Sequence, residues 1–349
     1  MKCTIQNIAD HLGLSRNTVS KALKTSSEVS ENTRNLVIKT ASKLGYKNAT
    51  FATPVIPASE TGSNGTILFL TRTYASDSEF WTTVLRGIES ILSNANYHLA
   101  ISIMSDSDLK QLNFPQTISD SSIKGIILVE ICDKVVCDAL SQFNLPIVSV
   151  DMPNVPFEEL NGIDVVTMES KKNLKKIINQ LIEKGAESFG FVGDLYSPNV
   201  SRGFQERYNA LSECLAEHQL PLNQKNCLLH QTPEDFRNFQ TTVNNLQAMI
   251  SLPDVFICGN DWTAIQLIYA LQFLGFQIPK DIYVVGFDNI PAASRISPSL
   301  TTISTPQKYL GIAAARQILE RIQHPNCPHV FCQYETELII RNSTNIISF

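Results

Sequence analysis

The chain has 349 residues, of which 43% are hydrophobic, and its formal net charge is −5. No apolar run approaches the roughly 18 residues that a membrane-spanning helix requires, and no apolar secretory segment follows the amino terminus. The composition argues against integral membrane and exported proteins, and it predicts a cytoplasmic protein without a membrane partner.

The charge is distributed unevenly along the chain. Residues 1–50 contain eight Lys and Arg against three Asp and Glu, whereas the remaining residues contain twenty against thirty. Because contacts from Lys and Arg to phosphates supply most nonspecific affinity for DNA, this asymmetry suggests a head that contacts a polyanion.

The eight cysteines do not indicate a metal or redox site. None forms a C-x-x-C pair, and the two C-x4-C pairs, at positions 132/137 and 327/332, have no histidine at a matching spacing. We predict reduced thiols and no metal or other cofactor; metal binding by these two pairs is the alternative.

The first 45 residues predict three short helices. Thr4, Ser15 and Ser30 can each cap the start of a helix, and Gly13 is suited to end the first one. The third helix would end before Gly45. This arrangement corresponds to a small, all-α domain.

The second predicted helix separates polar from apolar residues. At 100° per residue along a helix, one face carries Arg16, Asn17, Ser20 and Lys21. The opposite face carries the apolar residues Val19, Ala22 and Leu23. Arg pairs with guanine, Asn pairs with adenine, and Lys reaches guanine or phosphate, so this face suits the DNA major groove. The alternative is the solvated face of an ordinary three-helix bundle.

The rest of the chain predicts an α/β fold. Residues 48–63 are rich in Thr, Pro, Ala, Ser and Gly and are interpreted as a linker. After them, short apolar runs alternate with amphipathic segments of helix length, which indicates parallel sheets with crossover helices. We predict two lobes, with a ligand crevice at the carboxyl ends of their strands. The expected boundaries are 1–47 for the head, 64–162 with 291–322 for lobe 1, and 163–290 with 323–349 for lobe 2.

The stretch TIQNIADHLGLSRNTVSKAL, followed by a segment that ends in LGY, resembles the helix-turn-helix of the LacI/GalR repressor family. The resemblance implies that Arg16, Asn17 and Lys21 read bases. It also implies that the remaining DNA contacts come from Thr4, Ser15, Thr18, Ser20 and Tyr46. One departure concerns the linker: the family's hinge helix carries a Leu wedge, whereas this chain has Val55 there and Pro54 within the helix. We therefore expect a short hinge helix or none.

The resemblance continues through CGNDWTAIQLIYALQFLGFQIPKDIYVVGFD and ends in ETELIIRNST, and it implies a periplasmic-binding-protein-like effector domain. By this resemblance the effector contacts include Arg207, Asn260 and Asp288. Phe80 or Trp81 would stack on the ligand, with burial in the lobe core as the alternative. The remaining expected contact is Glu169, the nearest acid to a position where relatives have Asp, whereas Asp261 is expected to cap the following helix.

These features predict a DNA-binding transcriptional regulator that acts as a repressor, and they argue against an enzyme. No phosphate-binding loop, G-x-G-x-x-G or H-E-x-x-H motif occurs in the chain. The expected partners are a pseudo-palindromic operator of double-stranded DNA, a small-molecule effector that is a carbohydrate, and a second copy of the chain. A solute-binding protein of the same two-lobed fold is the alternative, and the head and the missing signal sequence argue against it.

Overall fold

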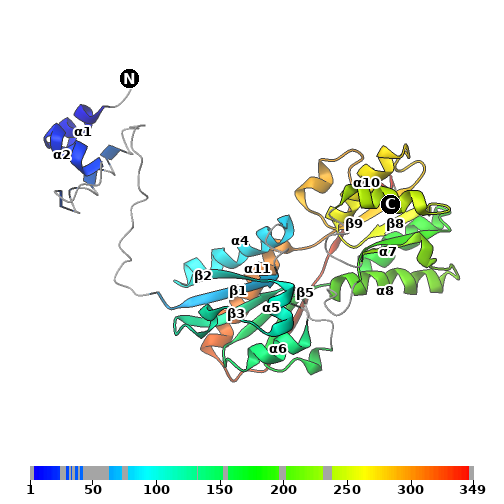
Figure 1. Cartoon of the computed structure of the whole chain (residues 1–349), viewed down its shortest axis with the longest axis horizontal. Coiled ribbons are helices and arrows are strands. Elements are labelled where there is room, and N and C mark those ends of the chain that lie inside the picture. Colours follow the sequence, from blue (N-terminus) through cyan, green and yellow to red (C-terminus); the bar gives the residue numbers. More distant parts are fainter. Residues whose placement is uncertain are drawn as a thin grey trace. The chain divides into compact units, whose positions relative to one another are not determined.

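The computed structural model describes residues 4–23, 29, 30, 33, 36, 37, 40, 41, 63–72, 78–131, 133–151, 156–195, 202–230 and 238–345. Tyr46 and the expected hinge around Pro54 lie outside the described residues. The chain divides between Gly62 and Ser63 into two compact units, each of which is described by itself (Figure 1).

The first unit is helical, as predicted. It contains α1 (Ile5–Leu12) and α2 (Arg16–Leu23), and the described residues between 33 and 41 are also helical. Thr4 caps α1 through the backbone N–H of Asn7, and Gly13 ends it in the left-handed region with φ 63°. The core of the unit consists of apolar residues from all three segments: Ile8, Ala9, Val19, Ala22, Val37 and Ala41.

The second unit begins with a six-stranded parallel sheet that forms the first lobe (Figure 1). Its strands, in spatial order, are β2 (His98–Met104), β1 (Thr66–Arg72), β3 (Ile123–Val129), β4 (Ile147–Val150), β5 (Ile163–Met168) and β11 (Phe331–Tyr334). Its helices are α4 (Glu79–Asn94), α5 (Asp106–Gln111), α6 (Lys134–Ser141) and α11 (Gln307–Gln323), with the 3-10 turns η2 (Gln116–Ser119) and η3 (Phe157–Glu159). One apolar cluster joins the sheet to α4 and α11, and another joins it to α5 and α6.

The second lobe repeats this architecture. Its sheet order is β7 (Leu228–His230), β6 (Phe189–Asp194), β8 (Val255–Cys258), β9 (Tyr283–Asp288), β10 (Thr301–Ser304) and β12 (Glu337–Ile339). Only β12 is antiparallel to its neighbour among these strands. The helices are α7 (Lys172–Glu183), α8 (Arg202–Glu217), α9 (Phe239–Ala248) and α10 (Asp261–Phe273), with η4 (Gln224–Asn226) and η6 (Pro291–Ser294). Apolar clusters bury α7 with α8 and α9 with α10 against the sheet.

The chain crosses between the lobes at three places: between β5 and α7, between β10 and α11, and between β11 and β12. The expected lobe boundaries at 162, 290 and 322 are corrected accordingly. Strand β5 pairs with β4, so residues 163–168 belong to the first lobe. Strand β10 pairs with β9 in the second lobe, and β11 returns to pair with β5 in the first.

Helices α4 and α11 pack closely because each has a glycine where they meet. A Cβ on Gly87 would collide with the carbonyl oxygen of Lys308, and a Cβ on Gly311 would collide with that of Val84. Both obstacles are main-chain atoms, which cannot rotate away, so the two glycines set the separation of these helices.

Within the described part of the chain, no helix combines the length and the apolar character that spanning a membrane requires.

Candidate functional site

The amphipathic character predicted for α2 is confirmed. Val19 and Ala22 are buried in the head core, whereas Arg16 and Asn17 are exposed. Lys21 is half-buried on the same polar side of the helix, as is Ser20. The helix thus presents the exposed hydrogen-bonding side chains of Arg16 and Asn17 on the side opposite to the head core.

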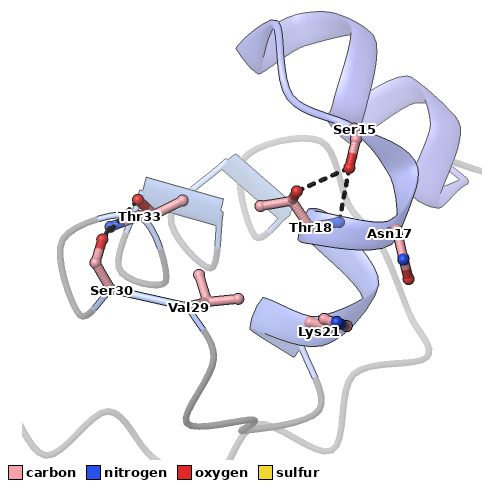
Figure 2. Close-up of a pocket in the computed structure, with 7 residues that line it drawn as sticks. All are labelled: Ser15, Asn17, Thr18, Lys21, Val29, Ser30 and Thr33. Atoms are coloured by element: carbon pink, nitrogen blue, oxygen red, sulfur yellow. Dashed lines mark hydrogen bonds between the residues drawn. The ribbon is translucent and has the colours of Figure 1, made fainter.

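A polar pocket of about 320 Å³ lies beside α2 (Figure 2). Ser15 accepts a hydrogen bond from the Thr18 backbone N–H at 3.0 Å, and their hydroxyl groups lie 2.8 Å apart. Ser30 and Thr33 repeat the arrangement, with distances of 3.3 Å and 2.8 Å. The pocket is lined by these residues with others from both segments: Ser15, Asn17, Thr18, Lys21, Val29, Ser30 and Thr33.

This pocket has the composition of a phosphate-binding surface. Hydroxyl groups and free N–H groups at the starts of helices attract anions, and Lys21 adds a positive charge. From the sequence, Ser30 is predicted only as a helix cap, and Thr33 is not among the predicted DNA contacts. The repeated S-x-x-T spacing, at 15–18 and 30–33, is a signal that could have identified the second pair.

In the second unit, charged residues occupy the carboxyl ends of strands in both lobes. Arg72 ends β1, Glu130 follows β3, Asp151 follows β4, Asp194 ends β6 and Asp288 ends β9. The order of strands in each sheet reverses at β1/β3 and at β6/β8. Such switch points are where open α/β sheets bind ligands. We call Glu130, Asp151, Asp194 and Asp288 the acidic cluster.

The charges of the acidic cluster influence one another across the two sheets. Burial raises the pKa of Glu130 to about 7, and the negative charges of Asp151 and Asp194 contribute in the same direction. Burial also raises the pKa of Asp288 well above its usual value; Arg207 opposes this rise, whereas Asp151 and Glu130 add to it. The carboxyl ends of the two sheets therefore form one electrostatic site.

Three members of the cluster have strained backbones. The φ angle is 55° at Glu130, 71° at Asp151 and 113° at Asp288. Residues other than glycine rarely adopt positive φ, at a cost on the order of 1–3 kcal/mol each, and such strain concentrates at functional sites. Its occurrence at the ends of three strands marks this edge as the site of the second unit.

Arg207 is held firmly among these acids. Its side chain comes from α8, is 3% exposed, and donates a hydrogen bond to the Gly259 carbonyl oxygen at 2.6 Å. The guanidinium carbon lies 3.6 Å from the centre of the Phe287 ring. Burial lowers the pKa of Arg207, and the charge of Asp288 acts against that decrease. The two residues predicted to bind an effector, Arg207 and Asp288, are thus brought together.

Two other predicted effector residues have local structural partners. The Asn260 side chain caps α10 by accepting a hydrogen bond from the Thr263 N–H at 2.9 Å. The Glu169 carboxylate accepts hydrogen bonds from the N–H groups of Lys171 and Lys172 at the start of α7, at 2.7 and 2.8 Å.

The expectation that Asp261 caps α10 is wrong, because Asn260 does so. Asp261 is instead buried inside the second lobe. Its carboxylate accepts hydrogen bonds from the Thr302 hydroxyl at 2.5 Å and the Ile290 N–H at 2.9 Å.

Phe80 and Trp81 belong to the apolar core of the first lobe, which was the alternative reading of these residues. Each is 6% exposed, and their rings meet edge to face at 4.7 Å. The Trp81 indole N–H nevertheless donates a hydrogen bond to Glu130 at 2.6 Å, which couples this core to the acidic cluster.

Arg72, Glu130, Asp151 and Asp194 are not among the site residues predicted from the sequence. A signal was present, because each stands at the end of an apolar strand run, as in GIILVE and LPIVSVD. Strand ends become a site only when the strand order is known, and periodicity does not provide that order.

Comparisons with known proteins agree with both units. A family model described as bacterial regulatory proteins, lacI family, matches residues 4–48, and one described as periplasmic binding protein-like domain matches residues 178–344. The chain is 26% identical to the HTH-type transcriptional repressor PurR of Photobacterium profundum, with 97% of this chain and 98% of that protein covered. It is 27% identical to the ribose operon repressor of Haemophilus influenzae, with the same coverage.

Solved structures show the same fold. A lac repressor dimer bound to operator has a TM-score of 0.67 at 19% identity, with 99% of each chain covered. A LacI family transcriptional regulator from Enterococcus faecium with bound ribose has a TM-score of 0.66 at 24% identity, covering 81% of this chain and 100% of that chain. The predicted α/β fold class is confirmed. The head is thus similar to bacterial regulatory proteins of the lacI family and the second unit to periplasmic binding proteins, and the chain is a ligand-regulated, DNA-binding transcriptional regulator.

Proposed function

We propose that this protein represses transcription as a homodimer whose two heads read a pseudo-palindromic operator, and that a polyhydroxylated effector bound at the acidic cluster changes its operator affinity. The observation that carries the proposal is the division of α2. The apolar side of α2 is buried in the head core, whereas Arg16 and Asn17 are exposed on the other side.

In this proposal the exposed face of α2 and the polar pocket beside it have different roles in binding DNA. Arg16 and Asn17 form hydrogen bonds to base edges, which carry sequence information. The pocket formed by the two hydroxyl pairs and Lys21 holds backbone phosphates, which fix the position of the head on the duplex. Thr4 belongs with this second group as the cap of α1.

Two exposed apolar patches support the homodimer. On edge strand β2 of the first lobe, Ile101 and Ile103 are 52% and 48% exposed. On α10 of the second lobe, Tyr269 and Phe273 are 43% and 69% exposed and lie one helical turn apart. Phe239 of α9 extends this patch through an edge-to-face contact with Phe273. Large exposed apolar groups of this kind are typical of protein–protein interfaces.

The effector site connects the lobes through the chain crossings. The carbonyl oxygen of Asp288 accepts hydrogen bonds from Thr305 and from Gln307, the first residue of α11. A ligand held by Arg207 and Asp288 would therefore act on a crossing segment that leads directly into the first lobe. The ligand can change the protein's affinity for operator DNA only if it binds one arrangement of the two lobes more tightly than another.

The test is duplex selection with the full chain and with Arg16→Ala. We expect the natural protein to enrich one pseudo-palindromic sequence from a randomised pool. Arg16→Ala should weaken binding to that sequence by about 1 to 3 kcal/mol and relax preference at one base pair in each half-site.

Arg295→Ala is the matched control, because Arg295 is exposed in the second unit and its removal changes the net charge equally. It should leave base preference unchanged. If Arg16→Ala retained the full preference, or if the natural chain enriched no sequence, the head would not be the reader that we propose.

A further inference from the structure

Phe204, in the first turn of α8, lies where the strand order of the second-lobe sheet reverses. A Cβ on Gly259, the residue after β8, would collide with the Phe204 ring, and a Cβ on Gly193, near the end of β6, would come within 2.9 Å of it. Both strands therefore carry a glycine where the ring rests on the backbone. The β6/β8 boundary is a switch point of the kind at which open α/β sheets bind ligands.

The ring of Phe204 is partly accessible in this position. It is half-buried, whereas the aromatic residues predicted from sequence to stack on the effector, Phe80 and Trp81, are each 6% exposed in the core of the first lobe. Gly193 directly precedes Asp194, which is a member of the acidic cluster. A partly accessible aromatic ring thus lies beside the strand ends at which we place the effector.

Arg207 provides a second, independent observation. It lies one helical turn after Phe204 on α8, and its guanidinium carbon is 5.6 Å from the centre of the Phe204 ring. The Arg207 side chain is 3% exposed, yet its Nε has no hydrogen-bond partner among the described residues. A buried donor that stays unpaired is costly. An oxygen atom of a ligand placed next to the ring would pair with it.

We infer that Phe204 is the stacking platform of the effector site and that the effector is a cyclic sugar. One face of the sugar ring lays its C–H groups on Phe204, and a hydroxyl or ring oxygen accepts a hydrogen bond from Arg207. The face of a phenyl ring is electron-rich, so it attracts the weakly positive C–H groups of a sugar. An open-chain polyol has the same hydroxyl groups but no rigid apolar face. This inference rests on the proposed effector site and names the chemistry of its ligand.

Matched ligands test the need for a ring. Thermal unfolding of the full chain and titration calorimetry are carried out with D-glucose, D-galactose, D-xylose and D-ribose, with the corresponding alditols, and with adenine and guanine as flat aromatic ligands. We expect at least one sugar to raise the Tm and to bind about tenfold more tightly than its alditol. Equal or tighter binding of the alditols, tighter binding of a purine base, or no stabilisation by any sugar would overturn the inference.

Phe204→Leu locates the stacking contact, because it keeps an apolar side chain and removes the aromatic face. Binding of the preferred sugar should weaken by about tenfold, and binding of its alditol should stay unchanged. A merely structural role of Phe204 would weaken both ligands equally. Phe157→Leu is the matched control, because Phe157 is a half-buried phenylalanine of the first lobe that packs against Phe331. The same effect of both variants on the ratio of sugar to alditol affinity would show that Phe204 is not the platform.

Gly259→Ala tests the position of the ring without changing the ring itself. The added Cβ fits only if the Phe204 ring moves, so the ratio of sugar to alditol affinity should fall as it does in Phe204→Leu. Urea denaturation of the ligand-free variants identifies those that fold. An unchanged ratio in a folded variant of either kind would overturn the inference.

Duplex selection, run in parallel without ligand, separates the two proposals. Selective duplex binding without any sugar binding would remove only the ligand class. Sugar binding without selective duplex binding would instead refute the regulatory function and keep the ligand class.

Discussion

Glu130 is the acid of the cluster whose protonation can be followed individually. Burial raises its pKa to about 7, although the hydrogen bond from Trp81 and the charge of Arg72 lower it. Because the folded state favours the protonated form, the stability that Glu130 contributes is present at low pH and is lost as the pH rises through about 7.

This pKa gives a spectroscopic prediction. Only Trp81 and Trp262 occur in the chain, so a Trp262→Phe variant reports Trp81 alone. Its fluorescence should change with a midpoint near pH 7, because the acceptor of the indole N–H gains or loses its charge there. Adding Glu130→Gln should abolish the transition, and adding Glu89→Gln should preserve it. A transition that persists without Glu130 would assign the titration to another group.

The residues of the head could be predicted from sequence, whereas three of the four acids of the acidic cluster, Glu130, Asp151 and Asp194, could not. The polar face of α2 follows from a spacing within eight residues, so Arg16 and Asn17 could be placed without the rest of the fold. Glu130 and Asp194 lie 64 residues apart, at the carboxyl ends of strands in two different sheets, and they interact only because the two lobes fold against each other. Asn260 and Glu169 were matched by position, but their local hydrogen bonds cap helices, which a motif does not reveal.

The buried ion pair between Asp164 and Arg321 joins strand β5 to helix α11. Arg321 donates from Nη2 and Nε to the carboxylate at 2.7 and 3.0 Å, and it also donates to the carbonyl oxygen of Pro328 at 2.9 Å. Asp164 accepts a further bond from the Val330 N–H. Burial raises the pKa of Asp164, but the hydrogen bonds from Arg321 and Gln317 outweigh it and keep the pKa below its usual value.

Removing Arg321 should therefore destabilise the first lobe strongly. Arg321→Ala leaves a buried carboxylate without its cation, and losses of about 3–5 kcal/mol are typical of that change. Urea denaturation at neutral pH measures the difference. Arg316→Ala, on the exposed face of the same helix, should stay within about 0.5 kcal/mol of the natural protein. If the two variants lost equal amounts of unfolding free energy, the ion pair between Arg321 and Asp164 would not stabilise the first lobe.

The same elements explain why the predicted lobe boundaries were wrong. The alternation of strands and helices correctly indicated two parallel sheets, but it does not say which sheet a strand joins. Strand β5 has a fully buried pattern that would suit either lobe, and β11 is only four residues long. Their assignment depends on pairing with partners that are distant in sequence.

The proposed dimer depends on the exposed aromatic patch on α10. Phe273→Glu places a charge at its most exposed aromatic residue and should shift the protein toward monomer in sedimentation velocity. Operator affinity should fall with it, because each head then binds alone. The control is Ile250→Glu: Ile250 is 95% exposed but lies in the loop after α9, outside both patches. A dimer that survives Phe273→Glu would have to associate through another surface.

The three crossings between the lobes also constrain how the protein is made. The first lobe needs α11 and β11, so its core cannot close until residue 334 has left the ribosome. The second lobe needs β12, which follows within five residues. Both lobes must therefore complete folding almost simultaneously, once residues 331–339 have been translated, whereas the head can fold far earlier. A prematurely terminated chain would carry a finished operator reader attached to two unfinished lobes, and such fragments are natural substrates for chaperones and proteases.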